Sequence, residues 1–153
     1  MAVTTSLDIG PIIERLGAMN SPAALGRAMQ AIAADLAGDV ALGFKSQTDP
    51  WGNPWKALAD STLEMRRKHG KGAEILRDTG VGQASIHAVH DMLSATLSVG
   101  PNASGYMSKH QDGRGVPRRA FFPIDEAGNI KLTAAAMASV IDHLETAAIG
   151  GAA

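Results

Sequence analysis

One long amphipathic segment constrains the fold of this 153-residue chain more than any other feature. Its large apolar side chains recur at steps of three and four residues, the spacing of one face of an α-helix. They are Leu25, Met29, Ile32, Leu36, Val40 and Phe44. Ser21 and Pro22 form a helix start, an N-cap residue followed by proline at the first helical position. We predict one helix over 22–45, roughly 36 Å long at 1.5 Å per residue.

Weaker patterns predict the elements around this helix. Further helices are predicted at 9–18, at 62–69 with Ser61 or Asp60 as the cap, at 104–110 and at 133–147. Alternating apolar residues over 86–91 and 93–99 indicate an antiparallel hairpin that turns at Asp91 and Met92. The half-apolar segment 116–123 contains prolines and suits a strand at a sheet edge. The prediction is one α+β domain over 1–147, with N-terminal helices, a small antiparallel sheet, a C-terminal helix and a flexible tail over 148–153.

Two tryptophans lie in segment 46–58, which the sequence predicts to be a chain of turns. The segment holds two prolines, a glycine, an aspartate and an asparagine. Trp51 and Trp55 could fold back over the long helix as a lid on the core. They could also form a contact surface, because tryptophan is enriched among interface anchors.

Composition excludes several classes of protein. The chain is 45% hydrophobic and 19% charged, which is typical of a folded domain rather than a disordered one. No apolar run approaches the ~20 residues of a membrane span, and residues 1–8 lack the features of a secretory signal. Cysteine is absent, so disulfides, thiolate metal sites and a cysteine nucleophile are excluded.

The net charge of −1 is unevenly distributed. Residues 1–60 carry a net −2, residues 61–119 a net +4 and residues 120–153 a net −3. The basic side chains of the middle section form two clusters, Arg66, Arg67, Lys68 and Lys71 over 66–71, and Lys109, Arg114, Arg118 and Arg119 over 109–119. Such clusters can neutralise phosphates or meet an acidic surface on a neighbouring subunit. A stacking platform for bases has little support, because few aromatic side chains accompany them.

Motifs for chemistry are weak. His87 and His90 lie three residues apart, a metal-ligand spacing on a helix, but this stretch reads as a strand and places them on opposite faces. The sequence has no Gly-x-Ser-x-Gly elbow, no His-Glu-x-x-His and no phosphate loop. We therefore expect no catalytic residue, no metal and no cofactor.

The order of five short motifs resembles that of a known family. The motifs are TDPWGNPW at 48–55, ILRDTG at 75–80, SI at 85–86, YMSKHQDG at 106–113 and PRRAFF at 117–122. Together they resemble the phage virion morphogenesis family, the tail completion proteins of Mu-like and P2-like tailed phages, over about residues 20–147. The chain departs from the pattern at Val81, Met107 and Ala120, where Leu, Ala and Pro are usual, and none of these changes removes a chemical group.

The resemblance implies positions that serve folding and assembly, because the family has no assigned active site. The matching signature residues are Asp49, Gly52, Trp55, Thr79, Gly80, Tyr106, His110, Gly113, Pro117, Arg119 and Phe121. Trp51 fills a variable position of the pattern. The interface candidates are Trp51, Trp55, Arg66, Arg67, Lys68, Lys109, His110, Arg114, Arg118, Arg119 and Phe121.

The function implied is structural: an assembly protein that completes the tail or the head–tail junction by oligomerising and capping, without catalysis. The expected partners are copies of itself in a ring, with a hexamer as one form, and tail-tube or head-neck proteins. Contact with passing DNA is compatible with the basic clusters, and no membrane partner is expected. Assembly is expected in the host cytoplasm, with the protein in the tail or neck of the virion. The alternatives are a small nucleic-acid-binding module using clusters 66–71 and 109–119, and third an enzyme, of which a metal at His87 and His90 would be the sign.

Overall fold

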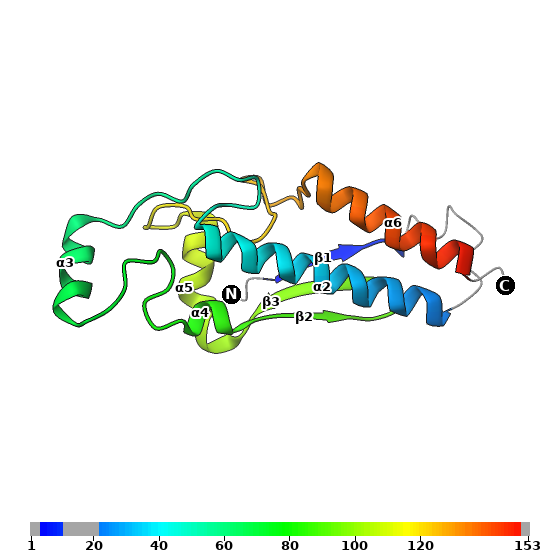
Figure 1. Cartoon of the computed structure of the whole chain (residues 1–153), viewed down its shortest axis with the longest axis horizontal. Helices are drawn as coiled ribbons and strands as arrows, with labels where there is room; N and C mark the ends of the chain where they lie inside the picture. The colour runs from blue at the N-terminus through cyan, green and yellow to red at the C-terminus, as the bar shows by residue number, and fades with distance from the viewer. Residues whose placement is uncertain (1–3, 11–21, 151–153) are drawn as a thin grey trace.

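The computed structural model describes residues 4–10 and 22–150, and it confirms the predicted α+β class. The molecule is elongated, and α2 (Pro22–Ser46), α6 (Ala134–Gly150) and the strands run roughly along its length, whereas α3 (Asp60–Lys68) and α5 (Pro101–Asp112) stand across it (Figure 1). The elements are β1 (Thr4–Asp8), α2 (Pro22–Ser46), α3 (Asp60–Lys68), α4 (Val81–Ala84), β2 (Ile86–His90), β3 (Ser94–Val99), α5 (Pro101–Asp112) and α6 (Ala134–Gly150). The helix predicted over 9–18 falls almost wholly outside the described residues.

The predicted long helix is confirmed as α2, and it lies at the centre of the fold. All six side chains of its apolar stripe are buried. The helix packs against β2 and β3 on one side and against α6 on the other (Figure 1). The stripe therefore forms the main part of the hydrophobic core, which explains why its periodicity is so regular.

A three-stranded antiparallel sheet has the order β1-β3-β2. The predicted hairpin of β2 and β3 is confirmed, and its turn is held by Asp91, whose Oδ1 accepts hydrogen bonds from the backbone N–H groups of Leu93 at 2.7 Å and Ser94 at 2.8 Å. Strand β1 was not predicted, because its sequence TTSLD contains one large apolar residue. It is defined by pairing with the central strand β3, where Thr4 lies opposite Ser98.

Helix α6 confirms the predicted C-terminal helix but not all of its apolar stripe. Val140 and Leu144 are buried against α2, whereas Met137 and Ile141 are 45% and 47% exposed. The helix continues to Gly150, three residues beyond its predicted end at 147.

One local prediction was wrong, and two predicted helices are present but begin earlier than expected. Segment 116–123 forms no strand, because groups of α5 accept hydrogen bonds from its backbone. The backbone N–H of Arg119 donates to the His110 carbonyl at 2.7 Å, and those of Phe121 and Phe122 donate to the Gln111 side chain. Helix α5 begins at Pro101 rather than near 104, with proline in its first turn, and ends at Asp112. The N-cap of α3 is Ala59, which makes no side-chain capping bond, rather than Ser61 or Asp60.

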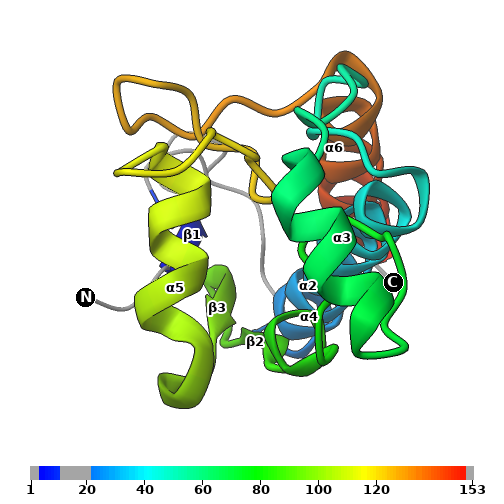
Figure 2. The same cartoon turned by 90° about the vertical axis from the view of Figure 1, so that its left-hand side faces the viewer.

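Helix α3 stands at one end of the long axis, beyond the C-terminal end of α2 (Figures 1 and 2). We call residues 59–72 the α3 arm. The main packing contacts between described helices and strands join α2, α6 and the sheet, and they do not include α3. The arm is held at its base by Arg66, whose Nη1 donates to the carbonyls of Gly72 at 3.3 Å and Glu74 at 2.7 Å.

Candidate assembly surfaces

Three interface candidates from both basic clusters meet in one pocket at the base of the α3 arm. Arg66, His110 and Arg119 line this cavity of about 410 Å³, which we call the arginine pocket. The other signature residues that line it are Thr79, Gly80 and Tyr106. Motifs far apart in the sequence therefore converge where the arm joins α4 and α5.

The two arginines of this pocket are buried and bind backbone carbonyls. Arg119 donates from Nε to the carbonyl of Lys56 at 2.8 Å and from Nη2 to that of Ala57 at 3.1 Å. Arg66 binds the carbonyls of Gly72 and Glu74, and its Nε lies 3.7 Å from a carboxylate oxygen of Asp78. Burial, followed by the positive charge of Arg66, lowers the pKa of Arg119 below its ordinary value. Arg119 thus fastens the chain at the start of the arm to the body, and Arg66 fastens α3 to the segment that follows it.

His110 serves the same junction. Its ring Nδ1 lies 3.4 Å from Nη1 of Arg119, and its backbone carbonyl accepts the Arg119 N–H. Burial and the neighbouring positive charge of Arg119 lower the pKa of the imidazole below its ordinary value. A neutral ring is therefore favoured beside the guanidinium, which suits a fixed structural contact.

The tryptophans of segment 46–58 have different surroundings. Trp55 is buried, its ring meets Phe44 edge-on with centroids 5.2 Å apart, and its Nε1 donates to the carbonyl of Ala120 at 2.8 Å. Phe121 is also buried, 5.9 Å from the Phe44 ring. Trp51 is half-buried and donates from Nε1 to the carbonyl of Lys131 at 3.0 Å. Trp55 is thus part of the core, as the lid interpretation expects.

Arg118 links Trp51 to the neighbouring loops. Its guanidinium lies 5.9 Å from the centroid of the Trp51 ring, a cation–π arrangement, and its Nη2 donates to the carbonyl of Ile124 at 2.8 Å. The interface candidates that remain largely exposed are Arg67, Lys68, Lys109 and Arg114. Of these, Lys68 pairs with Glu64 at 3.0 Å and Arg114 with Asp112 at 3.1 Å.

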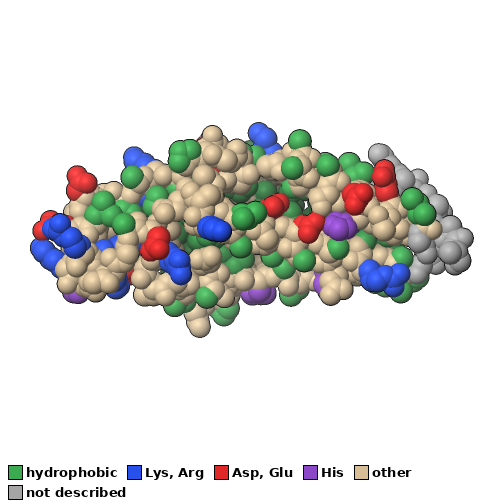
Figure 3. Space-filling model, in the orientation of Figure 1, with side chains coloured by type: hydrophobic (Ala, Val, Ile, Leu, Met, Phe, Trp, Pro, Cys, Tyr) green, Lys and Arg blue, Asp and Glu red, His purple; other side chains and the backbone are tan. Residues whose placement is uncertain are grey.

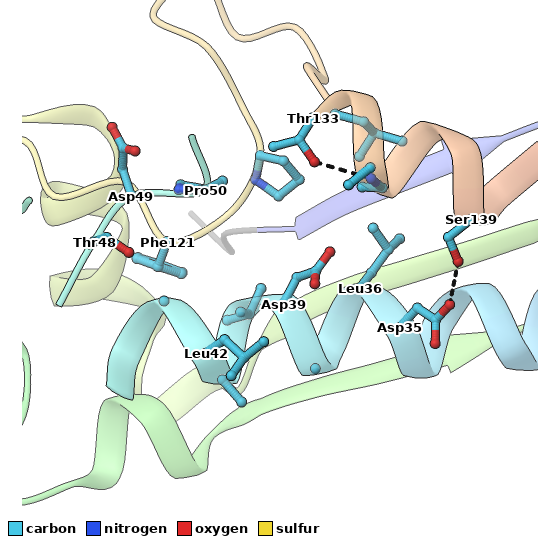
Figure 4. Close-up of a pocket in the computed structure, with 18 of the residues that line it drawn as sticks. Asp35, Leu36, Asp39, Leu42, Thr48, Asp49, Pro50, Phe121, Thr133 and Ser139 are labelled. Atoms are coloured by element: carbon cyan, nitrogen blue, oxygen red, sulfur yellow. Dashed lines mark hydrogen bonds between the residues drawn. The ribbon is translucent and has the colours of Figure 1, made fainter. Parts of the chain in front are cut away.

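A larger hollow lies between α2 and α6, with a volume of about 830 Å³ (Figure 4). We call it the α2–α6 groove. Its apolar lining includes Leu36, Val40, Leu42, Phe121, Pro123 and Leu132. Small residues of α2, among them Ala34, Gly38 and Ala41, also line the groove and leave space that larger side chains would fill. The groove therefore offers a concave apolar surface on the flank of the molecule.

Two carboxylates of α2 face this groove, and they have different environments. Asp35 accepts hydrogen bonds at Oδ2 from Ser139 Oγ at 2.6 Å and from His143 Nε2 at 2.8 Å, and these bonds lower its pKa. Burial and the charge of Asp35 raise the pKa of Asp39. Within 4–10 and 22–150, no hydrogen bond or ion pair reaches the Asp39 carboxylate. Asp39 is thus an exposed carboxylate at the groove that makes no hydrogen bond or ion pair with the described residues.

A sequence model of the phage virion morphogenesis family matches residues 8–139. The chain belongs to this family. No curated protein and no solved structure matches it. The match includes the arm, the arginine pocket and the whole of α2, and it ends at Ser139 in α6.

The histidine pair and the membrane question raised by the sequence of this virion morphogenesis protein can be compared with its structure. His87 lies between Ser98 Oγ at 2.8 Å and the Ser85 carbonyl at 3.1 Å. The described residues contain no group of three or more acidic or histidine side chains placed to hold a metal ion. Among the helices in the described ranges, none is both long and apolar enough to cross a bilayer.

Neither the α2–α6 groove nor the place of Asp39 in it was predicted from the sequence. A signal was available in the run of small residues on α2 outside the apolar stripe, because such residues leave room beside a helix. The basic clusters were identified, but charge patterns alone could not separate buried Arg66 and Arg119 from exposed Arg67 and Lys68.

Proposed function

We propose that this protein is a structural component that completes the phage tail or its junction with the head, by oligomerising and capping rather than by catalysis. Membership of the phage virion morphogenesis family supports a role in assembly. The observation that carries the finer proposal is the separation of unlike surfaces on an elongated molecule. The α3 arm, with three exposed basic and two exposed acidic side chains, stands at one end, and the apolar α2–α6 groove, which contains Asp35 and Asp39, lies on the flank.

Unlike surfaces on one chain favour head-to-tail association. A contact between two different patches repeats from copy to copy, and it closes into a ring when the rotation allows. A ring, with a hexamer as one form, would cap a tail tube or meet a neck protein through its two faces. Basic residues near the channel would tolerate passing DNA. Such a protein would act in the host cytoplasm during assembly and stay in the tail or neck of the virion.

The test of this proposal is genetic and structural. The reading frame is deleted from the phage or prophage, and particles are examined by electron microscopy with and without wild-type protein supplied from a plasmid. We expect separate heads and unfinished or overlong tails without the protein, and normal particles when it is supplied. Normal infectious particles from the deletion would contradict the proposed function.

A nucleic-acid-binding role has less support from the geometry. Arg66 and Arg119 are buried and bind backbone carbonyls. Two of the eight cations in the basic clusters therefore cannot reach a duplex, and fewer counterions would be released than the sequence indicates. Strong, salt-dependent binding of DNA by the full chain would favour this role instead.

A further inference from the structure

We infer that the α2–α6 groove receives the α3 arm of a second copy of this chain, with Met65 seated among the apolar lining and Lys68 paired with Asp39. The inference rests on the proposed function, because it requires that the protein self-associates. It goes further by assigning the two surfaces that meet.

The arm presents an apolar and a positive side chain on one face. Met65 is 57% exposed, and Lys68 lies one helical turn further along the same face. Ser61, four residues before Met65, is small and exposed, which allows a close approach. The pair between Lys68 and Glu64 is exposed on both sides, so it contributes little stability and can be exchanged for a better partner.

The groove offers the complementary features. Leu36, Val40 and Leu132 provide an apolar lining for a methionine side chain, which is flexible enough to fit an irregular cavity. The volume of about 830 Å³ is of the size that holds a drug-sized ligand, and so has room for several side chains. Asp39 supplies the negative charge that a cation entering the groove would meet.

The position of the arm makes this contact intermolecular. The arm stands beyond the end of α2, whereas the groove lies along α2 where it faces α6 (Figures 1 and 2). Figure 3 shows several Lys and Arg side chains, with a few acidic ones, at the end formed by the arm, and a group of Asp, Glu and His side chains, with some Lys and Arg nearby, over the α2 and α6 region. One copy cannot fill its own groove, so the contact joins unlike surfaces and repeats along a ring or filament.

The first test exchanges the charges. Lys68→Glu and Asp39→Lys are made singly, and self-association of the full chain is measured by sedimentation velocity at rising concentration and low salt. Each variant alone is expected to associate at least tenfold more weakly, because like charges then meet. An equimolar mixture is expected to recover association, because each arm then finds an oppositely charged groove in the other variant.

Matched controls separate this contact from net charge. Arg67→Glu changes the charge of the same helix by the same amount on another face, and Asp142→Lys does so on the exposed side of α6. Both controls should associate nearly as the wild type does. Equal weakening by controls and test variants, or no recovery in the mixture, would overturn the arm-and-groove contact. If the variants assemble unchanged, this contact is wrong while the proposed function stands.

A second test detects the contact even when it is weak. The chain has no cysteine, so the only thiols are those introduced by Met65→Cys on the arm and by Leu42→Cys at the groove. Mixed single variants are oxidised at high concentration and analysed by mass spectrometry. We expect a covalent heterodimer well above that formed with Ile149→Cys, an exposed site near the end of α6. Equal cross-linking at Leu42 and Ile149 would refute the contact.

Discussion

At the scale of single residues, Gln111 of α5 is notable because its buried side chain makes three hydrogen bonds to one distant backbone segment. It is 2% exposed, and its Oε1 accepts the N–H groups of Phe121 and Phe122, both at 3.0 Å. Its Nε2 donates to the carbonyl of Phe122 at 3.2 Å. One side chain therefore satisfies three backbone groups of a segment that has no strand partner. This explains how an irregular chain can lie buried against the core.

We predict that Gln111→Ala destabilises the monomer strongly. The change leaves the N–H groups of Phe121 and Phe122 without this partner, whereas the Phe122 carbonyl keeps its bond from the Ile124 N–H at 2.7 Å. Each unsatisfied buried group costs about 1–3 kcal/mol. Urea unfolding should show a loss of roughly 2–5 kcal/mol. Gln30→Ala, on an exposed face of α2, is the matched control and should change stability by about 0.5 kcal/mol or less. A loss at Gln111 as small as at Gln30 would show that water replaces these bonds.

At the scale of elements, α2 was predictable because its periodic stripe depends only on the local sequence. Strand β1 was not, because TTSLD becomes a strand through pairing with β3. Segment 116–123 looked like an edge strand because it is half apolar and contains prolines, which suit a strand at the edge of a sheet. Its N–H groups are nevertheless taken by α5, a contact between distant parts of the fold that local patterns do not encode.

The turn segment carrying the two tryptophans provides a test at this scale. Trp55→Phe removes the buried Nε1 bond to Ala120 and reduces the contact with Phe44, whereas Trp51→Phe removes a bond at the surface. We expect Trp55→Phe to lower the free energy of unfolding by about 1–3 kcal/mol. Trp51→Phe should cost about 1 kcal/mol or less.

Thermal and urea unfolding of the two tryptophan variants measure this difference directly. The remaining tryptophan reports the transition by fluorescence in each case. If Trp51→Phe is the more destabilising change, the segment is held by its surface contacts rather than by the core.

At the scale of the whole molecule, the candidate site combines features that sequence and structure reveal separately. The basic clusters and family motifs were visible in the sequence. Only the folded structure shows which basic residues are buried at the base of the arm and which are exposed on its surface. The groove was invisible, because it arises where α6 crosses a small-residue face of α2. Self-association would thus depend on surfaces that no single motif contains.

Asp39 leads to a prediction that separates folding from assembly. Because its pKa in the folded chain is raised above the ordinary 3.8, the ionised carboxylate opposes folding at neutral pH. The opposition shrinks as pH falls through the raised folded value and is gone below 3.8. Asp39→Asn should therefore stabilise the monomer at pH 7, by about 0.5 kcal/mol or less after solvent screening, and the gain should vanish near pH 3.8.

The same substitution should weaken self-association, because the neutral amide no longer attracts Lys68 of another copy. Urea unfolding at pH 7 and pH 4, with sedimentation velocity at pH 7, measures both effects, and Asp142→Asn controls for the loss of one charge. A destabilised Asp39→Asn monomer would mean that the carboxylate has an internal partner. A stabilised monomer that assembles as well as the wild type would mean that the groove does not use this charge. Opposite changes in the two measurements identify a residue whose charge is costly to the fold and used between copies.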